Sequence, residues 1–205
     1  VEIMHLDNQG PCGDRRYMIV DEQRRFITQR EEPSLARVQP SLLPLGLRLD
    51  TEGRAPLTVS DGATRRRVQV WRSELEALDA GEESAQWLSS YLDRSVRLVS
   101  MAPDVRRPID APHEGVATSV AFADGFPLLV THLASLKELN ERLDDPVSMN
   151  RFRANIVLDG GDAWEEDHWT AMSLGSAALT LPKPCERCKV ITVDQRTGET
   201  SKEPL

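Results

Sequence analysis

Residues 17–28, Tyr17-Met18-Ile19-Val20-Asp21-Glu22-Gln23-Arg24-Arg25-Phe26-Ile27-Thr28, decide the fold of the first half of the chain. An apolar run, a polar turn at 21–23 and a second extended run together form the pattern of a β-hairpin. Leu57–Val59 and Arg67–Trp71 repeat the strand pattern, the latter with polar and apolar residues alternating. The first half is therefore predicted to be mostly sheet.

Beyond this sheet the pattern changes twice. Between Glu82 and Leu92 apolar residues recur at helical spacing behind an acidic first turn, which predicts one amphipathic helix. Between Ala102 and Pro112 the composition shifts to Pro, Asp and Arg, and the prolines, Pro108 among them, are expected to interrupt any regular element. We place a domain boundary there, which divides the chain into residues 1–102 and 103–205.

The second half mixes strands with a helix. Phe126–Thr131 and Asn155–Leu158 are predicted strands, and Gly160-Gly161 ends the second of them. Between them, leucines at 133, 136, 139 and 143 repeat on one face of a helix. Ala177–Leu181 and Lys189–Val193 flank a cysteine-containing segment, so that segment is expected to join two strands of one sheet. The fold class is β-rich α+β: an N-terminal sheet domain with one helix, then a β-barrel with packed helices.

Charge and composition limit the classes of partner that the protein is expected to bind. Thirty-three acidic against 25 basic residues give a formal net charge of −8, the wrong sign for a protein whose main partner is nucleic acid or an anionic membrane. A small anion can still bind locally. No apolar run approaches the roughly 20 residues that span a bilayer, and the first residues do not form a signal peptide. With only three cysteines, the protein is expected to be cytoplasmic and to keep its thiols reduced.

Two of these cysteines form a C-x-x-C pair in Lys183-Pro184-Cys185-Glu186-Arg187-Cys188. Structural zinc needs two further ligands, and Cys12 and the four histidines do not stand at zinc-finger spacing. A thioredoxin-like pair belongs at a strand-to-helix turn, whereas β-branched sequence follows here. Two thiols buried as small apolar groups are a third reading. The fourth is a thiolate ligand for a soft metal, because Cys188 stands between Arg187 and Lys189, whose charge favours ionised sulfur.

Arginines next to predicted elements form a second group of candidates. Arg15 and Arg16 precede the first strand, and Arg151 and Arg153 precede Asn155. In an acidic protein such arginines are usually paired with surface carboxylates, which contributes little. If they converge, their guanidinium groups would hold phosphate, and the amide of Asn155 could contact the edge of a heterocycle.

At this point the residues resemble a known family. Residues 13–21 and 28–33 (Thr28-Gln29-Arg30-Glu31-Glu32-Pro33) are similar to the N-terminal β-barrel-type domain that accompanies MOSC domains. Residues 122–127, 151–157 and 183–198 resemble the MOSC domain itself, a β-barrel, so the match runs in order across almost the whole chain. The resemblance is to the MOSC-domain molybdenum proteins, in particular the mitochondrial amidoxime-reducing component and its bacterial counterparts.

The resemblance implies a cofactor, molybdenum–molybdopterin, and a set of residues around it. Cys188 would supply the protein thiolate to the metal, whereas Cys185 would be structural. Arg15 would contact the cofactor phosphate, Asp124 and Gly125 would line the pterin, Arg153 and Asn155 would bind pterin and phosphate, and Arg187 would complete the lining. Two family features fall outside this sequence: a Pro-x-Lys-Ser segment that also holds the phosphate, and further strands that close the domain. Either the chain is part of a longer protein or the cofactor site is degenerate.

The implied activity is two-electron reduction of N-hydroxylated or N-oxide compounds at molybdenum. Asp124 is the carboxylate nominated for catalysis, with a structural turn aspartate as its alternative role. The chain has no G-x-G-x-x-G motif and too few cysteines for a four-cysteine cluster, so a separate reductase or iron–sulfur protein is expected to deliver electrons. Two other functions stay open: a sulfur carrier that holds a persulfide on Cys188, and a binding module without chemistry.

Overall fold

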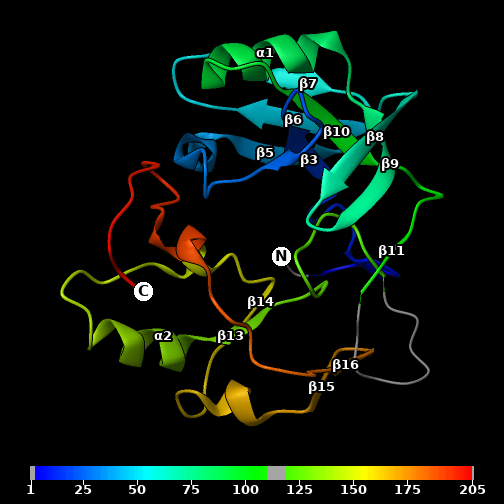
Figure 1. The fold of residues 1–205 in the computed structure, drawn as a ribbon. Coiled ribbons are helices and arrows are strands. Elements are labelled where there is room, and N and C mark those ends of the chain that lie inside the picture. The colour runs from blue at the N-terminus through cyan, green and yellow to red at the C-terminus, as the bar shows by residue number, and fades with distance from the viewer. Residues whose placement is uncertain (1–2, 110–118, 205) are drawn as a thin grey trace.

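A computed structural model describes residues 3–109 and 119–204 of the chain (Figure 1). The first half is built on a five-stranded antiparallel sheet in the order β4-β3-β10-β9-β8. Its strands are β3 (Tyr17–Val20), β4 (Phe26–Ile27), β8 (Thr64–Val70), β9 (Ser73–Asp79) and β10 (Arg97–Met101). The hairpin predicted over residues 17–28 is thus confirmed as β3 and β4.

This sheet curls until its two edges meet. Arg25, beside β4, forms a bridge with Gln69 of β8, and the backbone N–H of Gln69 donates to the carbonyl of Arg24 at 2.9 Å. The curl removes most of the free edge that a flat sheet would expose. The predicted β-barrel-like character of the N-terminal half is confirmed by this closure.

A second, three-stranded sheet and the predicted helix cover the barrel-like sheet. The strands are β5 (Gln39–Leu43), β6 (Gly46–Asp50) and β7 (Leu57–Val59), and α1 spans Glu82–Leu92 as the spacing predicted. Leu88 of α1 is fully buried together with Leu47, Val59 and Leu98 in one apolar cluster. The apolar face of the helix therefore packs against the two sheets.

The first residues of the second half pack into the core of the first half. β11 (Arg107–Pro108) pairs with β12 (Ser119–Val120), and Ala121 and Phe122 then lie in the core cluster formed by β3, β8, β9 and β10. The buried guanidinium of Arg107 donates to the carbonyls of Ala121, at 2.9 Å, and of Ala123. This insertion fixes where residue 124 and its neighbours emerge. It also shows that Pro108 does not exclude a strand, because proline is tolerated in an edge strand of two residues.

The remaining elements of the second half are short. β13 (Val130–His132) pairs in parallel with β14 (Ile156–Leu158), and β15 (Ala171–Leu174) pairs with β16 (Ala177–Thr180). α2 spans Leu133–Asn140, and 3₁₀ turns occupy Pro33–Arg37, Met149–Phe152, Glu165–His168 and Lys189–Thr192. Two further strands, β1 (Leu6–Asp7) and β2 (Gly10–Pro11), form a small hairpin near the beginning of the chain. Among residues 3–109 and 119–204, no helix is long and apolar enough to cross a membrane.

Three predictions for the second half were wrong in detail. The strand expected over Phe126–Thr131 is confined to Val130–His132, because Pro127 instead lies against Gly10 of β2. The helix expected to reach residue 143 ends at Asn140, whose side chain bonds the backbone of Val147. The cysteine segment does not join two strands, as described next.

Residues 189–192 form a 3₁₀ turn instead of the predicted strand. The N–H of Ile191 donates to the carbonyl of Cys188 at 3.1 Å, and that of Val193 to Val190 at 3.1 Å. Ile191 and Val193 are buried, so the β-branched residues fill a core position from a turn. Cys188 therefore stands at the beginning of this turn, after the loop that follows β16.

The carboxylate of Asp79 is a buried charge on which the first-half sheet depends. It accepts hydrogen bonds from Arg66 at 2.6 Å, from Arg97 at 2.7 and 3.0 Å, and from the N–H of Gly81 at 2.9 Å. Burial alone would raise the pKa of Asp79, but these donors lower it to about 2. Since the lowered pKa is a property of the folded state, the ionised carboxylate stabilises the fold.

Replacing Asp79 with asparagine should therefore lower the free energy of unfolding by about 2 kcal/mol at neutral pH. The deficit should be constant above pH 5 and shrink as the pH falls from 4 towards 2, because over that range the unfolded wild-type chain gains a proton at Asp79 while the folded carboxylate is still mostly ionised. Urea unfolding of both proteins between pH 7 and pH 3 measures this. A deficit that does not change with pH would contradict the assigned role.

Candidate functional site

Arg30 lies at the centre of the candidate site, in the loop that follows β4. Its Nη2 donates to the Asp124 carboxylate at 2.9 Å and to the sulfur of Cys188 at 3.2 Å. The guanidinium also lies over the ring of Trp71, 4.9 Å from the centroid. Partial burial alone would lower the pKa of Arg30, but the bonds to Asp124 and Cys188 raise it above its ordinary value. One cation thus joins the sheet of the first half to two separate segments of the second.

Arg30 was not among the residues chosen from the sequence, although residues 28–33 carry part of the family resemblance. Its position follows from local structure: the Thr28 hydroxyl accepts from the N–H of Arg30 at 3.1 Å, and the Thr28 carbonyl accepts from Glu31 and Glu32 at 3.0 Å. This tight turn fixes the backbone from which the side chain of Arg30 reaches Trp71, Asp124 and Cys188. The motif residues 28–33 were the only available signal, because arginine at a turn is otherwise unremarkable in sequence.

A second cluster gathers around Arg15. Its guanidinium bonds the Asp14 carboxylate and donates to the carbonyl of Arg153 at 3.0 Å and to Asn155 Oδ1 at 3.4 Å. Asn155 Nδ2 donates to Asp14 at 2.9 Å, and its Oδ1 also accepts from the N–H of Leu129 at 3.0 Å. Arg15, Arg153 and Asn155, chosen separately from the sequence, are therefore brought together. The amide of Asn155 keeps one N–H for any further partner.

Arg153 connects the two clusters electrostatically. Desolvation, and then the nearby charge of Arg15, lower its pKa; Arg30 lowers it further, while Asp14 and Asp124 oppose the shift. Within the described part of the chain its side chain makes no hydrogen bond or ion pair. A cation held among other cations without its own counter-ion is the arrangement that favours binding of an anion.

The cysteines differ in their surroundings. Cys185 is exposed and accepts a hydrogen bond from Arg187 Nη1 at 3.2 Å, whereas Cys188 is half-buried and is contacted by Arg30. The other nitrogen of Arg187 donates to the carbonyl of Phe152 at 2.8 Å. The structure thus places Arg187 against Cys185 and the 149–152 turn, and the guanidinium beside Cys188 comes from Arg30 instead. Among the described residues, no group of three or more His, Cys, Asp or Glu side chains is arranged to hold a metal ion.

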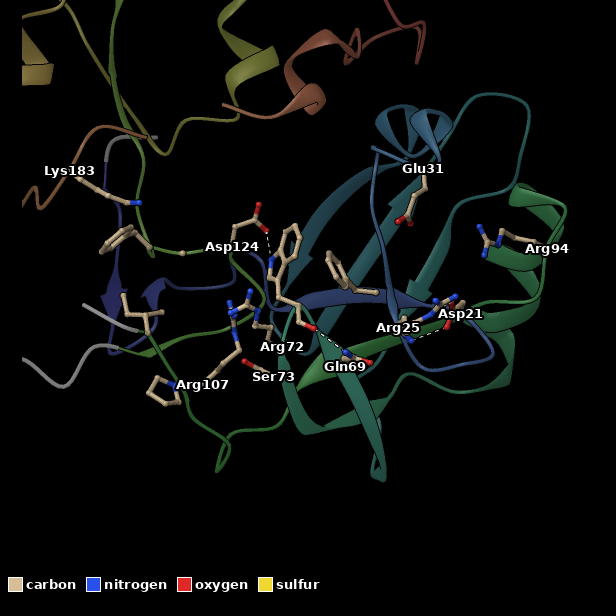
Figure 2. Close-up of a pocket in the computed structure, with 16 residues that line it drawn as sticks. Asp21, Arg25, Glu31, Gln69, Arg72, Ser73, Arg94, Arg107, Asp124 and Lys183 are labelled. Atoms are coloured by element: carbon tan, nitrogen blue, oxygen red, sulfur yellow. Dashed lines mark hydrogen bonds and ion pairs between the residues drawn. The ribbon is translucent and has the colours of Figure 1, made fainter. Parts of the chain in front are cut away.

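Asp124 also borders a broad pocket of about 1030 Å³ (Figure 2). Asp124 Oδ1 accepts a hydrogen bond from the indole N–H of Trp71 at 3.1 Å, so both carboxylate oxygens are held, one by Trp71 and one by Arg30. Gly125 lines the same pocket, and a Cβ there would meet nothing within 4 Å. The space beside Asp124 is therefore open, and the glycine is not required by a close approach of another group.

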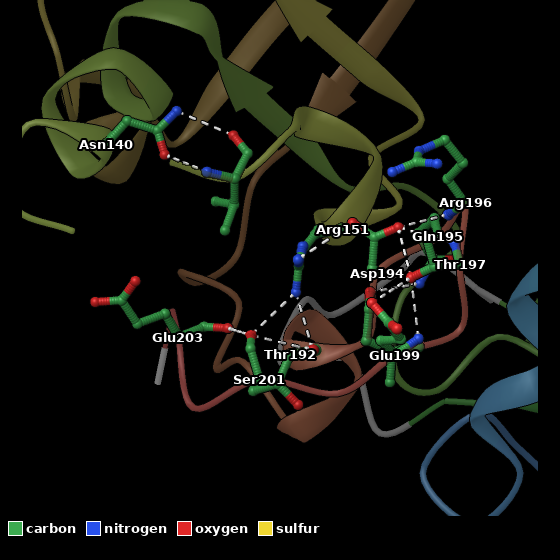
Figure 3. Close-up of polar contacts among 12 residues, drawn as sticks. Asn140, Arg151, Thr192, Asp194, Gln195, Arg196, Thr197, Glu199, Ser201 and Glu203 are labelled. Atoms are coloured by element: carbon green, nitrogen blue, oxygen red, sulfur yellow. Dashed lines mark hydrogen bonds and ion pairs between the residues drawn. The ribbon is translucent and has the colours of Figure 1, made fainter. Parts of the chain in front are cut away.

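The arginines that do not face the site have structural partners. Arg151 Nη1 donates to the carbonyl of Thr192 at 2.9 Å, and Nη2 contacts Asp194 at 3.3 Å (Figure 3). Asp194 in turn accepts from the backbone N–H groups of Arg196 and Thr197 at 2.9 Å, and the bond from Thr197 is the main cause of its lowered pKa. Arg16 is likewise paired with Asp7. Arg151 therefore anchors the turn that presents Cys188.

Comparison with known proteins gives two domain matches. Residues 1–95 match the MOSC N-terminal beta barrel domain, and residues 117–205 match the MOSC domain. The chain is 33% identical to mitochondrial amidoxime-reducing component 1 of Mus musculus, over 96% of this chain and 60% of that protein. It is 32% identical to the Homo sapiens protein of that name, over 96% and 61% respectively. It is 28% identical to molybdenum cofactor sulfurase of Bos taurus, over 97% of this chain and 25% of that protein.

If Arg153 binds an anion, its charge should destabilise the ligand-free folded protein and stabilise the anion-bound protein. Arg153→Met should leave the melting temperature unchanged or raise it, because a cation that is repelled by the nearby charges of Arg15 and Arg30 is removed. Inorganic phosphate should raise the melting temperature of the wild-type protein but not of this variant. Thermal unfolding with and without phosphate measures both effects.

Arg196→Met is the matched control, because Arg196 is exposed and its side chain is unpaired within the described residues. Phosphate should stabilise this control as it does the wild-type protein. Equal stabilisation of the Arg153 variant would contradict an anion site at Arg153.

Proposed function

Because the chain belongs to the MOSC family, with a MOSC N-terminal β-barrel domain followed by a MOSC domain, we propose that it binds a molybdenum–pterin cofactor with Cys188 as the protein ligand. The observation that carries the proposal is the contact of Arg30 with the Cys188 sulfur at 3.2 Å. A cysteine binds a metal through its sulfur as the thiolate, and the guanidinium of Arg30 lies where its positive charge would face that sulfur.

The residues present fit such a cofactor chemically. Arg153, with a guanidinium that has no partner among the described residues, and Arg15 beside it would hold the phosphate. Asp124, Gly125 and the remaining N–H of Asn155 would line the pterin. Arg187 contacts Cys185 and the carbonyl of Phe152, and would hold in place the loop that carries Cys188. These roles extend the resemblance residue by residue and are proposals for each position.

The proposed reaction is the reduction of N-hydroxylated or N-oxide compounds. The cofactor, when bound, supplies the two-electron redox chemistry, while the chain orients it and shapes the pocket. Asp124 is held on both oxygens by donors, so in this arrangement it accepts hydrogen bonds and positions neighbouring groups. Its nomination as a catalytic carboxylate stays a prediction.

The electron donor is proposed to be a separate reductase or iron–sulfur protein. The chain spans about 60% of the length of the amidoxime-reducing components that it matches, so the activity of the whole protein is itself a proposal. We expected a cytoplasmic protein, while the relatives named here are mitochondrial in name. A cytoplasmic location for this protein therefore stays a prediction.

A second function, sulfur transfer, is favoured by the similarity to molybdenum cofactor sulfurase over 97% of this chain. In that case Cys188 would carry a persulfide, and Arg30 would stabilise its negative charge. The same residues would serve both functions, because a thiolate ligand and a persulfide carrier both need an accessible, cation-stabilised sulfur. Metal content separates the two.

The test is molybdenum per chain in protein made in a cofactor-producing host, for the wild-type protein, Cys188→Ala and Cys185→Ala. Near-stoichiometric molybdenum should be present in the wild-type protein and in the Cys185 control, and should be lost in the Cys188 variant. Molybdenum that is absent from all three folded proteins, with a persulfide on Cys188 by mass spectrometry, would overturn the molybdenum proposal in favour of sulfur transfer. Retention of the metal in Cys188→Ala would overturn the assignment of the ligand.

A further inference from the structure

The cluster around Arg15 contains a carboxylate as well as cations, and only one oxygen of that carboxylate is used. Asp14 Oδ2 is bonded by Arg15 Nη1 and accepts from Asn155 Nδ2 at 2.9 Å. Within residues 3–109 and 119–204 no donor bonds Asp14 Oδ1, and 31% of the side chain is exposed. An ionised carboxylate can accept hydrogen bonds on both oxygens. Asp14 Oδ1 is therefore an acceptor that is open to a ligand.

The groups around Asp14 also keep hydrogen-bond donors that they do not use. A guanidinium carries five N–H groups, and Arg15 uses three of them on the partners described above. The amide of Asn155 keeps one N–H, and the side chain of Arg153 makes no hydrogen bond among the described residues. The cluster therefore presents several donors together with the one open acceptor of Asp14.

The backbone that carries both arginines of this cluster is strained. Arg15 has a φ of 49° and Arg153 a φ of 54°, a left-handed conformation that residues other than glycine adopt only rarely. The carbonyl of Arg15 accepts from the N–H of Phe122 at 3.1 Å, and the N–H of Arg153 donates to the carbonyl of Asn150 at 3.2 Å. Such strain persists where the surrounding structure enforces it, often at ligand sites. The fold thus holds both arginines in place before a ligand binds.

A carboxylate among cations distinguishes between anions by whether they carry a proton. Sulfate offers only hydrogen-bond acceptors at neutral pH, so beside an ionised carboxylate it meets a like charge and cannot bond it. Inorganic phosphate keeps at least one hydroxyl at neutral pH, which can donate to a carboxylate while its other oxygens accept from guanidinium groups. A charged group left without a hydrogen-bond partner costs more than a neutral one, and such a cost against the wrong ligand gives specificity.

We propose that Asp14 determines the specificity of this anion site: it accepts a hydrogen bond from a protonated phosphate oxygen and rejects anions without a proton, such as sulfate. Arg15 and Arg153 hold the other oxygens of the phosphate. That the site takes a phosphate rests on the function proposed above, in which these two arginines bind the phosphate of the cofactor. The chain therefore selects a phosphate group that carries one proton.

The test compares inorganic phosphate with sulfate on the full chain, made in a host that cannot synthesise the cofactor so that the site is not filled. The dissociation constants come from the rise in melting temperature with anion concentration at neutral pH, with the ionic strength held constant by sodium chloride. The wild-type protein should bind phosphate about tenfold more tightly than sulfate. Asp14→Asn removes the charge and keeps the shape, so it should bind sulfate about tenfold more tightly and lose the preference. A purely structural role of Asp14 would instead weaken both anions alike.

Asp7→Asn is the matched control, because Asp7 pairs with the neighbouring Arg16 and its loss removes the same charge from the same end of the chain. This variant should keep the tenfold preference. A preference for phosphate that survives in Asp14→Asn would overturn the inference. Equal affinity of the wild-type protein for the two anions, or binding of neither, would overturn it without any variant. A preference that depends on Asp14, in a protein that takes up no molybdenum in a cofactor-producing host, would overturn the proposed function and leave the role of Asp14 supported.

Discussion

The site depends on one guanidinium group, that of Arg30, which contacts a carboxylate and a sulfur from distant parts of the chain. Asp124 follows the segment buried in the first-half core, whereas Cys188 begins a 3₁₀ turn near the end of the chain. Without Arg30, Asp124 and Cys188 would be two separate, exposed or half-exposed groups on loops. Arg30, fixed by the Thr28 turn and stacked on Trp71, places both within reach of the same cofactor or substrate.

The rest of the fold supplies the rigidity that this interaction needs. Ala121 and Phe122 are buried among the strands of the barrel-like sheet, and Arg107 holds the carbonyls on either side of Phe122, so Asp124 emerges at a defined place. Arg151 performs a similar role for the turn of Cys188 through Thr192 and Asp194. The candidate site is therefore made of loops, but each loop is anchored by a buried contact within a few residues. Such anchoring holds functional groups in place when they stand on loops.

The sequence predicted those parts of the fold that depend on local pattern. The hairpin at 17–28 and the helix at 82–92 were correct because alternation and helical spacing decided them locally. The strand expected over Lys189–Val193 was wrong because β-branched residues also fill core positions from a 3₁₀ turn. Arg30 was missed because its partners lie 94 and 158 residues away, and nothing local distinguishes it. Arg15, Arg153 and Asn155 could be nominated because they stand next to predicted elements and because the family resemblance connects such distant positions. Their roles at the cofactor stay proposals.

Molybdenum K-edge X-ray absorption of the cofactor-loaded protein tests most directly whether Cys188 binds the metal in a site shared by both halves of the chain. Serine can replace the protein sulfur with an oxygen ligand, so Cys188→Ser should keep the metal that Cys188→Ala loses. The number of sulfur atoms around molybdenum should then be one lower in Cys188→Ser than in the wild-type protein, because only the pterin sulfurs remain. The same sulfur count in both proteins would contradict the assignment and leave Cys188, with Arg30 beside it, to serve sulfur transfer instead.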